Sequence, residues 1–403
     1  MAKADSPVSL GGQSASPAAA IPARVDLLIV GAGIMGLWAA VKADRLGINT
    51  LLIDLAHPAA GASGGLLGAL MPHMPDRFND KKQFQFDALL SLEDEVARLE
   101  AETGLSCGYR RCGRLIPLPK PHLRSLAEGH SRQAEAHWQA PGRRFFWNVL
   151  DRPPQPDWLS QDAAPSGVVE DTFAARVSPR RLTAALVQAI DAGRHVRRVD
   201  GLGVDRLEGR AAHLSNGETI AFGHVIIAAG PGSFPLLQQL GAASLPLVRP
   251  LGAAVKGQAA LLKADVDPDL PVLFLNGLYV VAHEDGHVAI GSTSEDVFDA
   301  PFTTDGQLDQ LIEKARALSP KLHDAEIVER WAGLRPKAID RDPMVGPHPD
   351  FPHVIALTGG FKVSFGLAHR SADAALAATG ATACSLPASF SLLHHLEVAQ
   401  TQK

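Results

Sequence analysis

The sequence predicts an α/β fold in which a parallel-sheet domain is interrupted by an antiparallel-sheet domain. Three observations support this. First, a strand, a glycine-rich turn, a helix and a second strand follow one another within residues 26–54. Second, two later apolar strands, 225–227 and 354–357, also run into glycines. Third, the stretch between them, 246–293, is rich in strand-like segments. Strands that alternate with helices are typical of a parallel sheet.

Residues 26–54 form the most informative unit. The apolar run 27–30 has the character of a strand buried on both faces. It ends at the spacing Gly31-x-Gly33-x-x-Gly36, and a helical stretch then reaches residue 45. The second strand ends at Asp54. A strand before the glycines and a helix after them make this spacing much more specific than the glycines alone.

Each part of this unit has a physical role in binding a dinucleotide. Gly31 permits the tight turn, Gly33 lets the main chain approach a pyrophosphate, and Gly36 lets the helix lie close to the strand. The helix N-terminus offers free N–H groups to phosphates. Asp54 can accept a hydrogen bond from a ribose hydroxyl and disfavours a 2′-phosphate, so NAD or FAD is expected rather than NADP. The alternative is a glycine-rich turn that binds nothing.

The next elements extend this domain. Small residues dominate 57–72, which suits either cofactor contact or a flexible surface loop. The apolar period over 86–101 predicts an amphipathic helix. A second helix is expected from Pro179 to Gly193, with Ser178 as its cap. The strand 224–228 then runs into Ala229 and Gly230, which suggests a second approach of the main chain to the same dinucleotide.

The middle and the tail of the chain differ in character. The turn 284–286 predicts a hairpin between strands 279–281 and 288–290, and an amphipathic helix follows near 308–318. The strand 354–357 opens into a glycine loop at 359–366 and then a helix. This order repeats that of the N-terminal unit, and its helix N-terminus can meet a second polar part of a large cofactor.

Composition narrows the classes of function. The 403 residues are 46% hydrophobic and carry a net charge of −5, which gives no reason to expect nucleic acid or an anionic membrane surface. Three cysteines without metal-ligand spacing favour a reducing compartment, the cytoplasm, and no metal site. No apolar run is long enough to span a membrane. Residues 1–23 read as a disordered leader.

Six segments in order give the chain a resemblance to the FAD-dependent amine oxidase family that includes glycine oxidase, D-amino acid oxidase and sarcosine oxidase. It covers residues 24 to about 380. The segments are Gly31 to Asp54; Ala62-Ser63 through Gly68-Ala69-Leu70; Val177-Ser178-Pro179-Arg180; Val225 to Gly230; Lys256-Gly257-Gln258 with Tyr279-Val280-Val281; and Gly333-Leu334-Arg335-Pro336 with Gly359 to Gly366.

The resemblance implies a Rossmann-like FAD-binding domain and a set of cofactor contacts. FAD is expected to be non-covalent, because sarcosine oxidases attach their flavin through a cysteine near the Gly333 region and this chain has none between Cys112 and Cys384. The expected FAD-binding residues are Gly31, Gly33, Ile34, Met35, Gly36, Asp54, Ala62, Ser63, Gly68, Ala69, Leu70, Val204, Ala229, Gly230, Gly359, Gly360, Phe361, Lys362, Val363 and Ser364.

Three residues are expected to act at the substrate. Arg335 matches the family's carboxylate-binding arginine, and a planar, permanently charged guanidinium suits a carboxylate physically. The alternative is a structural arginine bonded to carbonyl groups. Tyr279 matches a substrate-pocket tyrosine but can also be an ordinary strand tyrosine. Lys362 can place positive charge near flavin N1 and C2=O, or can simply be solvated.

Two departures from glycine oxidase put glycine itself in doubt as the substrate. Glycine oxidase has an arginine where Lys362 stands and a histidine where Gly277 aligns. The expected domains are 24–80, 165–245 and 326–395 for FAD, and 81–164 and 246–325 for the substrate.

The expected function is oxidation of the C–N bond of a small amino acid, a D-amino acid or a glycine-like acid. Hydride transfer to flavin N5 would give an imine, which water hydrolyses. The reoxidant can be O₂ or another acceptor, and a homo-oligomer is possible. Alternatives are an amine dehydrogenase, an oxidase of carboxymethylaminomethyl-modified tRNA, and a non-catalytic dinucleotide-binding protein.

Overall fold

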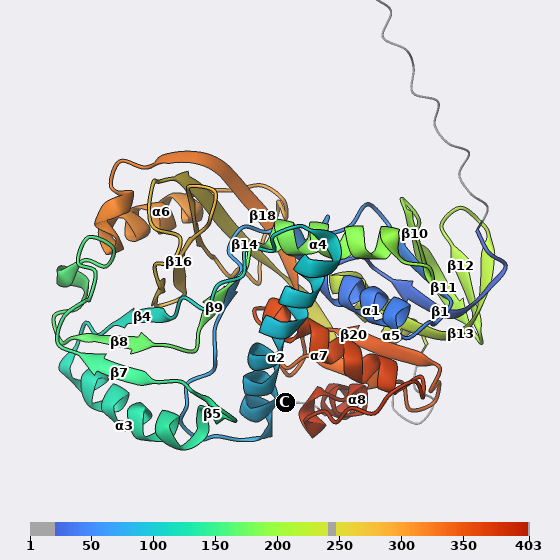
Figure 1. Ribbon diagram of the computed structural model, residues 1–403. Helices are drawn as coiled ribbons and strands as arrows, with labels where there is room; N and C mark the ends of the chain where they lie inside the picture. Colours follow the sequence, from blue (N-terminus) through green and yellow to red (C-terminus); the bar gives the residue numbers. More distant parts are fainter. Residues whose placement is uncertain (1–20, 241–246, 402–403) are drawn as a thin grey trace, which may run out of the picture.

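Two lobes lie side by side in the computed structural model, each built on one large β-sheet (Figure 1). The structure describes residues 21–240 and 247–401. Most of the expected disordered leader and the expected domain boundary at 245–246 therefore lie outside the described residues. Among the described residues, every helix is too short or too polar to span a bilayer.

The first sheet contains the strands of the glycine-rich unit. β1 pairs in parallel with β2 on one side and with β13 on the other, and β13 pairs in parallel with β20. Because these strands run the same way, their carboxyl ends meet at one edge of the sheet. The strands of this sheet are β1 (Arg24–Val30), β2 (Thr50–Asp54), β10 (Val196–Asp200), β11 (Val204–Glu208), β12 (Ala211–Leu214), β13 (Thr219–Ile227), β19 (Met344–Pro347) and β20 (Val354–Thr358).

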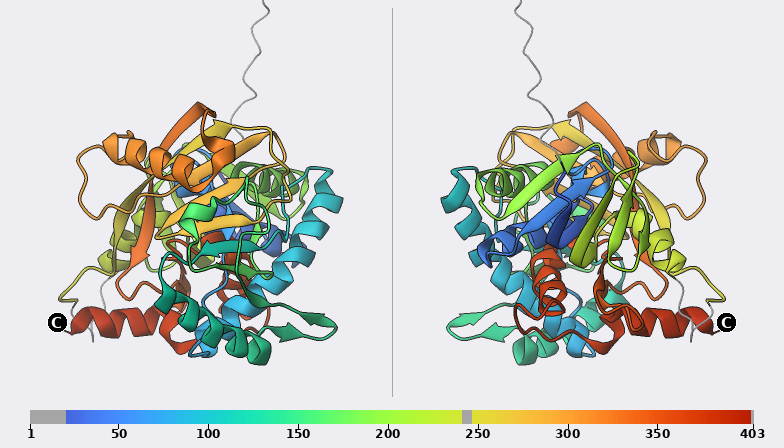
Figure 2. Two further views of the ribbon diagram at one scale, coloured as in Figure 1. Left: turned by 90° about the vertical axis from the view of Figure 1, so that its left-hand side faces the viewer. Right: turned by 90° about the vertical axis from the view of Figure 1, so that its right-hand side faces the viewer.

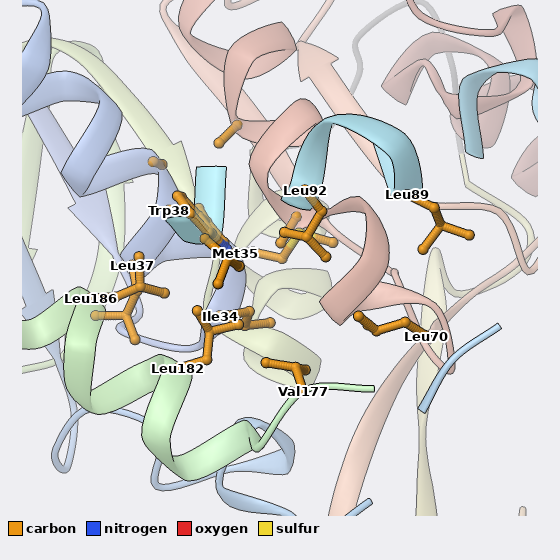
Figure 3. Packing of buried hydrophobic residues seen from close by; sticks show 14 of the residues in the cluster. Ile34, Met35, Leu37, Trp38, Leu70, Leu89, Leu92, Val177, Leu182 and Leu186 are labelled. Atoms are coloured by element: carbon orange, nitrogen blue, oxygen red, sulfur yellow. The ribbon is translucent and has the colours of Figure 1, made fainter. Parts of the chain in front are cut away.

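Four helices form a layer on one face of this sheet. They are α1 (Ile34–Arg45), α2 (Asp80–Thr103), α4 (Pro179–Ala192) and α7 (Ser364–Ala377). Figure 3 shows side chains of α1, α2 and α4 converging, with Leu37 of α1 beside Leu186 of α4; Leu37, Trp38, Leu182 and Leu186 are all fully buried. On the other face, α5 (Ser233–Gln239) and α8 (Leu392–Gln400) contribute to a second apolar cluster. The sheet is therefore buried on both faces, as the continuous apolar runs predict.

The second sheet has the strand order β18-β14-β17-β16-β15-β4-β8-β7. All its pairs are antiparallel except β15 with β4. Helix α6 (Gly306–Leu318) packs against it, and α3 (Pro121–His137) lies along β7. Its strands are β4 (Arg114–Pro117), β7 (Trp147–Leu150), β8 (Val168–Asp171), β14 (Gly252–Lys263), β15 (Val272–Leu275), β16 (Leu278–Ala282), β17 (His287–Gly291) and β18 (Glu326–Ala338).

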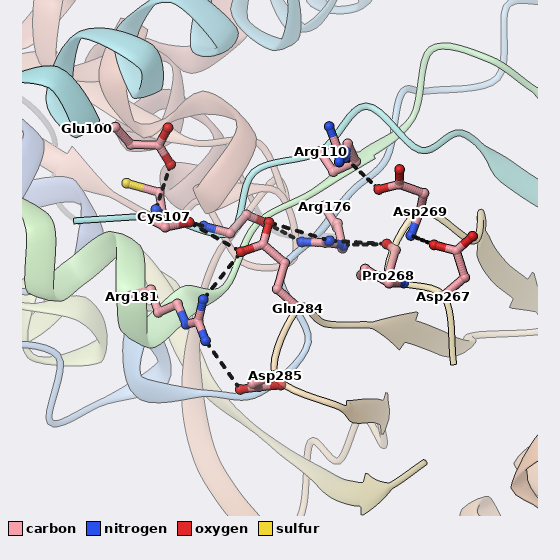
Figure 4. A network of polar contacts seen from close by, with 12 residues as sticks. Glu100, Cys107, Arg110, Arg176, Arg181, Asp267, Pro268, Asp269, Glu284 and Asp285 are labelled. Carbon is pink, nitrogen blue, oxygen red and sulfur yellow. Dashed lines mark hydrogen bonds and ion pairs between the residues drawn. The ribbon is translucent and has the colours of Figure 1, made fainter. Parts of the chain in front are cut away.

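Short strands lie near the junction of the two lobes (Figures 1 and 2), and a network of polar side chains joins the lobes. Two-stranded ribbons are formed by β3 (Ala69–Leu70) with β9 (Ala175–Arg176) and by β5 (Gln139–Ala140) with β6 (Arg143–Arg144). The buried Arg176 donates to the carbonyl of Pro268 and lies 3.8 Å from Glu284 (Figure 4). Arg181, on α4, pairs with the same Glu284 at 3.3 Å. The β16–β17 hairpin is thus fixed to the first lobe.

The structure confirms the expected hairpin at 284–286 and refines several other expectations. Helix α2 begins at residue 80 rather than 86, because the Asn79 side chain accepts from the Lys82 N–H and caps a polar first turn. Ser178 stands at the start of α4 but makes no side-chain cap.

The sheets also divide the chain differently from the expected domain segments. β8 and β18 belong to the second sheet although 165–245 and 326–395 were expected in the first domain, and α2 packs on α4 and α7 of the first lobe. The reason is that β18 continues without a break from one lobe towards the other, so sequence position alone does not mark the boundary.

Candidate active site

A cavity of about 840 Å³ opens between the two sheets. One part of its wall comes from the first sheet, at the edge where β1 and β2 end, and we call this the glycine end, defined by Gly31, Gly33, Asp54 and Val204. The other part comes from the second sheet, and we call this the arginine end, defined by Arg114, Phe274, Tyr279 and Arg335. Ligand sites at the carboxyl edge of a parallel sheet are the rule in such folds.

Main-chain geometry shapes the glycine end. Gly31 has φ +104°, and a Cβ there would lie 2.5 Å from the carbonyl oxygen of Ala228, so no other residue fits. A Cβ on Gly36 would lie 1.8 Å from the carbonyl oxygen of Gly31, which explains how closely α1 approaches β1. Gly33 precedes α1 and offers no side-chain cap, so the helix N-terminus faces the cavity. This is a cradle for a phosphate group.

Asp54 and Ser63 complete the glycine end. One carboxylate oxygen of Asp54 accepts from the N–H of Ala32 at 2.7 Å, and the other accepts from the N–H of Ala56 at 2.9 Å. A carboxylate has about four acceptor positions, so it can still accept from a ribose hydroxyl. The Ser63 hydroxyl accepts from the N–H of Ile34 at 2.9 Å, at the first turn of α1. Polar groups therefore surround the helix N-terminus on two sides.

The second glycine loop is tied to the strand that carries Arg335. Gly360 forms a β-bridge with Lys337, and the N–H of Phe361 donates to the carbonyl of Pro336 at 3.2 Å. Gly359 has φ +74° and Phe361 has φ +43°, so the chain turns sharply just before α7. Helix α7 also begins without a side-chain cap, and Val363 and Ser364 at its start line the cavity. Two helix N-termini, each preceded by a residue that provides no side-chain cap, thus open on one cavity.

These features fit a long dinucleotide. The α1 N-terminus suits a pyrophosphate, Asp54 suits a ribose, and the α7 N-terminus suits a second polar group with partial negative charge. None of the three cysteines lines the cavity, so no thiol stands ready to attach a cofactor covalently.

Arg335 projects from β18 into the cavity wall and meets few protein partners. Its Nη1 donates to the carbonyl of Thr293 at 3.2 Å. Within residues 21–240 and 247–401, no carboxylate lies within ion-pair distance of it. Burial lowers the pKa of Arg335 to about 10, although Tyr279 and Glu295 act in the opposite direction. The group is still charged at neutral pH, and it can therefore take a carboxylate from a ligand.

Glycine and a polar network hold this guanidinium in place. On β14, a Cβ at Gly257 would lie 2.0 Å from Arg335 Nη1, so only glycine leaves room for the guanidinium. The Thr293 hydroxyl accepts from the N–H of Gln258 at 2.8 Å and donates to Glu295. Glu295 in turn faces the buried Lys256, at 3.5 Å. The carbonyl that Arg335 uses is thus fixed by a chain of buried contacts.

Tyr279 and Lys362 lie on the same wall. Tyr279 packs against Phe274, with ring centroids 4.8 Å apart. Burial raises the pKa of Tyr279, although Arg114 and Arg335 act to lower it, so the phenol stays neutral and can donate at neutral pH. Lys362 is exposed and lines the cavity. Partial desolvation, followed by repulsion from Arg335, lowers the pKa of its ammonium group.

The structure brings the predicted site residues together with one exception. All of the expected FAD-binding and substrate residues line the cavity except Gly36, which packs beneath Gly31. Gly277, where glycine oxidase has a histidine, is the second residue of the tight turn between β15 and β16. There Asn276 has φ +48° and Gly277 has φ +87°. Such paired positive φ values belong to a two-residue hairpin and favour glycine.

Sequence reasoning missed part of the wall. Arg114, Phe274 and Trp331 line the cavity but were not expected there. Arg114 and Phe274 come from strands without a recognisable motif, whereas Trp331 stands two residues before the Gly333–Pro336 segment on β18. A signal for Trp331 was available in the two glycines beside it. A Cβ at Gly333 would lie 2.5 Å from the Trp331 ring, and one at Gly65 would lie 3.4 Å away. Arg114 had no comparable signal in its own segment.

Comparisons with known proteins agree with this geometry. Glycine oxidase of Pseudomonas aeruginosa is 29% identical over 366 residues, 86% of this chain and 92% of the relative. The bifunctional protein ThiO/ThiG of Synechocystis sp. is 29% identical over 348 residues, but the chain spans only about half, 47%, of that relative's length. The crystal structure of glycine oxidase from Geobacillus kaustophilus superposes with a TM-score of 0.79 at 22% identity. That alignment covers 92% of this chain and 99% of the other, and it shows that the fold is shared.

A family model settles the classification. The model described as DAO, FAD dependent oxidoreductase, matches residues 26–374. The match begins just before the glycine-rich unit and ends within α7, so it includes the N-termini of α1 and α7 and also Arg335. The chain belongs to the DAO family of FAD-dependent oxidoreductases.

Proposed function

We propose that the protein uses FAD to oxidise the C–N bond of a small amino acid to an imine, with a D-amino acid or a glycine-like acid as substrate. The observation that carries this proposal is Arg335, a charged guanidinium without a carboxylate partner among the described residues. It shares one cavity wall with the dinucleotide cradle. FAD, when bound, supplies the two-electron acceptor.

Arg335 would bind and orient the substrate. A bidentate contact between its guanidinium and the substrate carboxylate fixes the distance and the rotation of the α-carbon. Tyr279, as a neutral phenol, can donate a second hydrogen bond to that carboxylate. Both groups stand on the second sheet, and the adjacent Phe274 excludes water from this part of the cavity.

The charges at the arginine end favour a neutral amine. Arg114, Arg335 and Lys362 are the cations that line this part of the cavity. The carboxylates on the described wall, Asp54 and Asp205, belong to the first sheet. Nearby positive charge lowers the pKa of a bound amine, so its ammonium loses a proton on binding. Loss of a hydride from the α-carbon of the neutral amine then leaves a protonated imine, which gives its proton to water, so no dedicated base is needed beside the substrate.

A spectrum followed by a substrate screen tests the proposal. The purified protein should show a flavin band near about 450 nm. Glycine, sarcosine, D-alanine and D-proline are then tested with O₂, scoring peroxide, and with an artificial electron acceptor, scoring its reduction. Turnover with either acceptor supports the proposal, and turnover with the artificial acceptor alone identifies a dehydrogenase. Colourless protein, or no turnover with any amine, would overturn it.

We also propose a location in the cytoplasm and a free amino acid, rather than tRNA, as the substrate. Three free cysteines suit the cytoplasm. The tRNA alternative is disfavoured by the net charge of −5, and oxidation of a free amino acid would exclude it as the main activity. Oligomeric state is measured by light scattering of the FAD-loaded protein.

A further inference from the structure

Arg114 lies at the arginine end although no motif points to it. It is the first residue of β4, only 3% of its surface is exposed, and it lines the same cavity as Arg335. β4 lies two strands from β16, which carries Tyr279, with β15 between them. A charged side chain buried to this degree needs compensation, since an isolated buried charge is costly.

The protein compensates this charge only in part. Arg114 Nη2 lies 2.5 Å from Asp171 Oδ2 as an ion pair without hydrogen-bond geometry. The other oxygen of Asp171 accepts from the N–H groups of Phe173 and Ala174, which fixes the carboxylate. The Arg114 guanidinium also lies 5.7 Å from the Trp147 ring centroid. Asp171 and Trp147 therefore hold this guanidinium in position, and they leave some of its N–H donors without an acceptor.

The remaining donor can reach the cavity. Nη2 of Arg114 faces Asp171, and Nε is fully buried without a hydrogen-bond acceptor among the described residues. Nη1 is therefore the guanidinium nitrogen that can meet a molecule in the cavity. In the part of the chain that the structure describes, no side chain or carbonyl group accepts from Nη1, so a ligand oxygen in the cavity would satisfy a donor that the protein leaves free.

The charge of the cavity wall points to an anion. The second sheet contributes Arg335 and Arg114 to the wall, Lys362 lies beside the first of these, and the carboxylates that line the cavity are on the first sheet. Tyr279 lies close enough to feel both arginines, since each of them acts to lower its pKa. One substrate carboxylate occupies Arg335 under the proposed function, which leaves Arg114 for another.

We propose that Arg114 forms a second anion subsite, so that the preferred substrate is an amino acid or secondary amine with a second, distal carboxylate. This inference rests on the proposed function for the identity of the reaction, but the anion subsite itself can be tested without turnover. β18 and β4 are separated by four strands of the same sheet, so the two guanidinium groups enter the cavity wall at different positions.

Calorimetric titration of the FAD-loaded protein with unreactive acids tests the subsite directly. The probes are malonate, succinate, glutarate and adipate, each compared with the monocarboxylate of the same chain length at low salt. At least one of the dicarboxylates should bind about tenfold or more tightly than its monocarboxylate, as expected for an added charge-assisted contact. Equal affinities throughout the series would overturn the proposal.

Paired variants assign the effect to Arg114. The double variant Arg114→Gln/Asp171→Asn replaces the ion pair with two neutral amides and should lose the preference. The matched control Asp171→Asn keeps the guanidinium and should retain it. A double variant that still prefers dicarboxylates would overturn the assignment. If the double variant does not fold, Arg114→Lys keeps the charge but not the planar fork, and it should reduce the preference.

Turnover separates this inference from the proposed function. D-glutamate is compared with D-glutamine, and D-aspartate with D-asparagine, as kcat/KM ratios. A ratio of about ten or more for an acid over its amide supports the second subsite. Amine oxidation without such a ratio overturns the second subsite and leaves the proposed function standing. Tight dicarboxylate binding without oxidation of any amine supports the second subsite and overturns the proposed function.

Discussion

At the glycine end of the cavity the wall is largely main chain, and at the arginine end it is largely side chain. At the glycine end, Gly31 and Gly36 are required because a Cβ at either position would collide with backbone atoms. The polar groups that this end offers to a ligand are N–H groups of α1. At the arginine end, Arg114, Tyr279 and Arg335 reach in from three separate strands of the second sheet. Recognition by the main chain suits a cofactor that stays the same. Recognition by side chains can change, because substituting those side chains lets the site accept another substrate.

The largest effect is expected from a substitution at Gly31, in the main-chain wall of the glycine end. Gly31→Ala forces a Cβ to within 2.5 Å of the Ala228 carbonyl oxygen at φ +104°, so the turn must rearrange. Loss of the flavin band and of FAD-dependent thermal stabilisation is expected, measured by absorbance and calorimetry. The control is Gly129→Ala in α3, where a Cβ meets nothing within 4 Å. FAD retained at the wild-type level in Gly31→Ala would contradict the main-chain account.

At the arginine end the corresponding change is Arg335→Ala. A charge-assisted bidentate contact contributes roughly 3 kcal/mol, so KM for carboxylate substrates should rise at least about 100-fold. FAD content should stay unchanged, because the cradle does not use this side chain. Arg330→Ala is a matched control on the same strand, since Arg330 is exposed and pairs with Asp309 at 2.6 Å. Unchanged KM would remove Arg335 from the site.

Asp54 is the exception that sharpens the contrast, because it is a side chain at the glycine end. Asp54→Asn removes the charge but keeps the shape, and it weakens the acceptor for the Ala32 N–H. FAD affinity of the apoprotein should fall about tenfold, while KM of the reconstituted enzyme is unaffected. A change in KM with normal FAD affinity would show that the two ends are not independent.

A change in stability, with no change in ligand binding, is expected in the helix layer beneath the glycine end. His369 on α7 is fully buried against Trp38 and the Ser91 hydroxyl, and burial lowers its pKa to about 3. Between about pH 3 and 6.5 the unfolded chain binds a proton there that the folded protein does not, so stability falls as pH falls through this range. The slope is about 1.4 kcal/mol per pH unit.

His369→Gln tests this contribution. The variant should have a lower free energy of unfolding at pH 8, and this free energy should depend less on pH between 6.5 and 4. Urea titrations at each pH measure it. An equal slope in wild type and variant would show that His369 is already protonated in the folded protein.

The same contrast explains what could be predicted from sequence. The unit β1–α1–β2 was predicted within a few residues because glycines, helix and strand are local, and the main-chain site is made from them. The start of α2 was missed because its first turn, Asp80 to Gln83, is polar and its cap is a single asparagine. Arg335 was found through a resemblance. Arg114 was not found, because its burial depends on Asp171 and Trp147, whose strands come far later in the chain.

β18 has a consequence for how such a protein can change over time. The strand pairs with β14 along nearly its whole length, and Lys337 near its end bridges to Gly360 in the second glycine loop. The distance between the part of β18 that carries Arg335 and the second glycine loop is therefore set by main-chain hydrogen bonds. Substitutions on β4, β15 or β16 can alter which side chain of a substrate is accepted without disturbing that distance. The reaction can thus be inherited unchanged while substrate choice diverges among descendants.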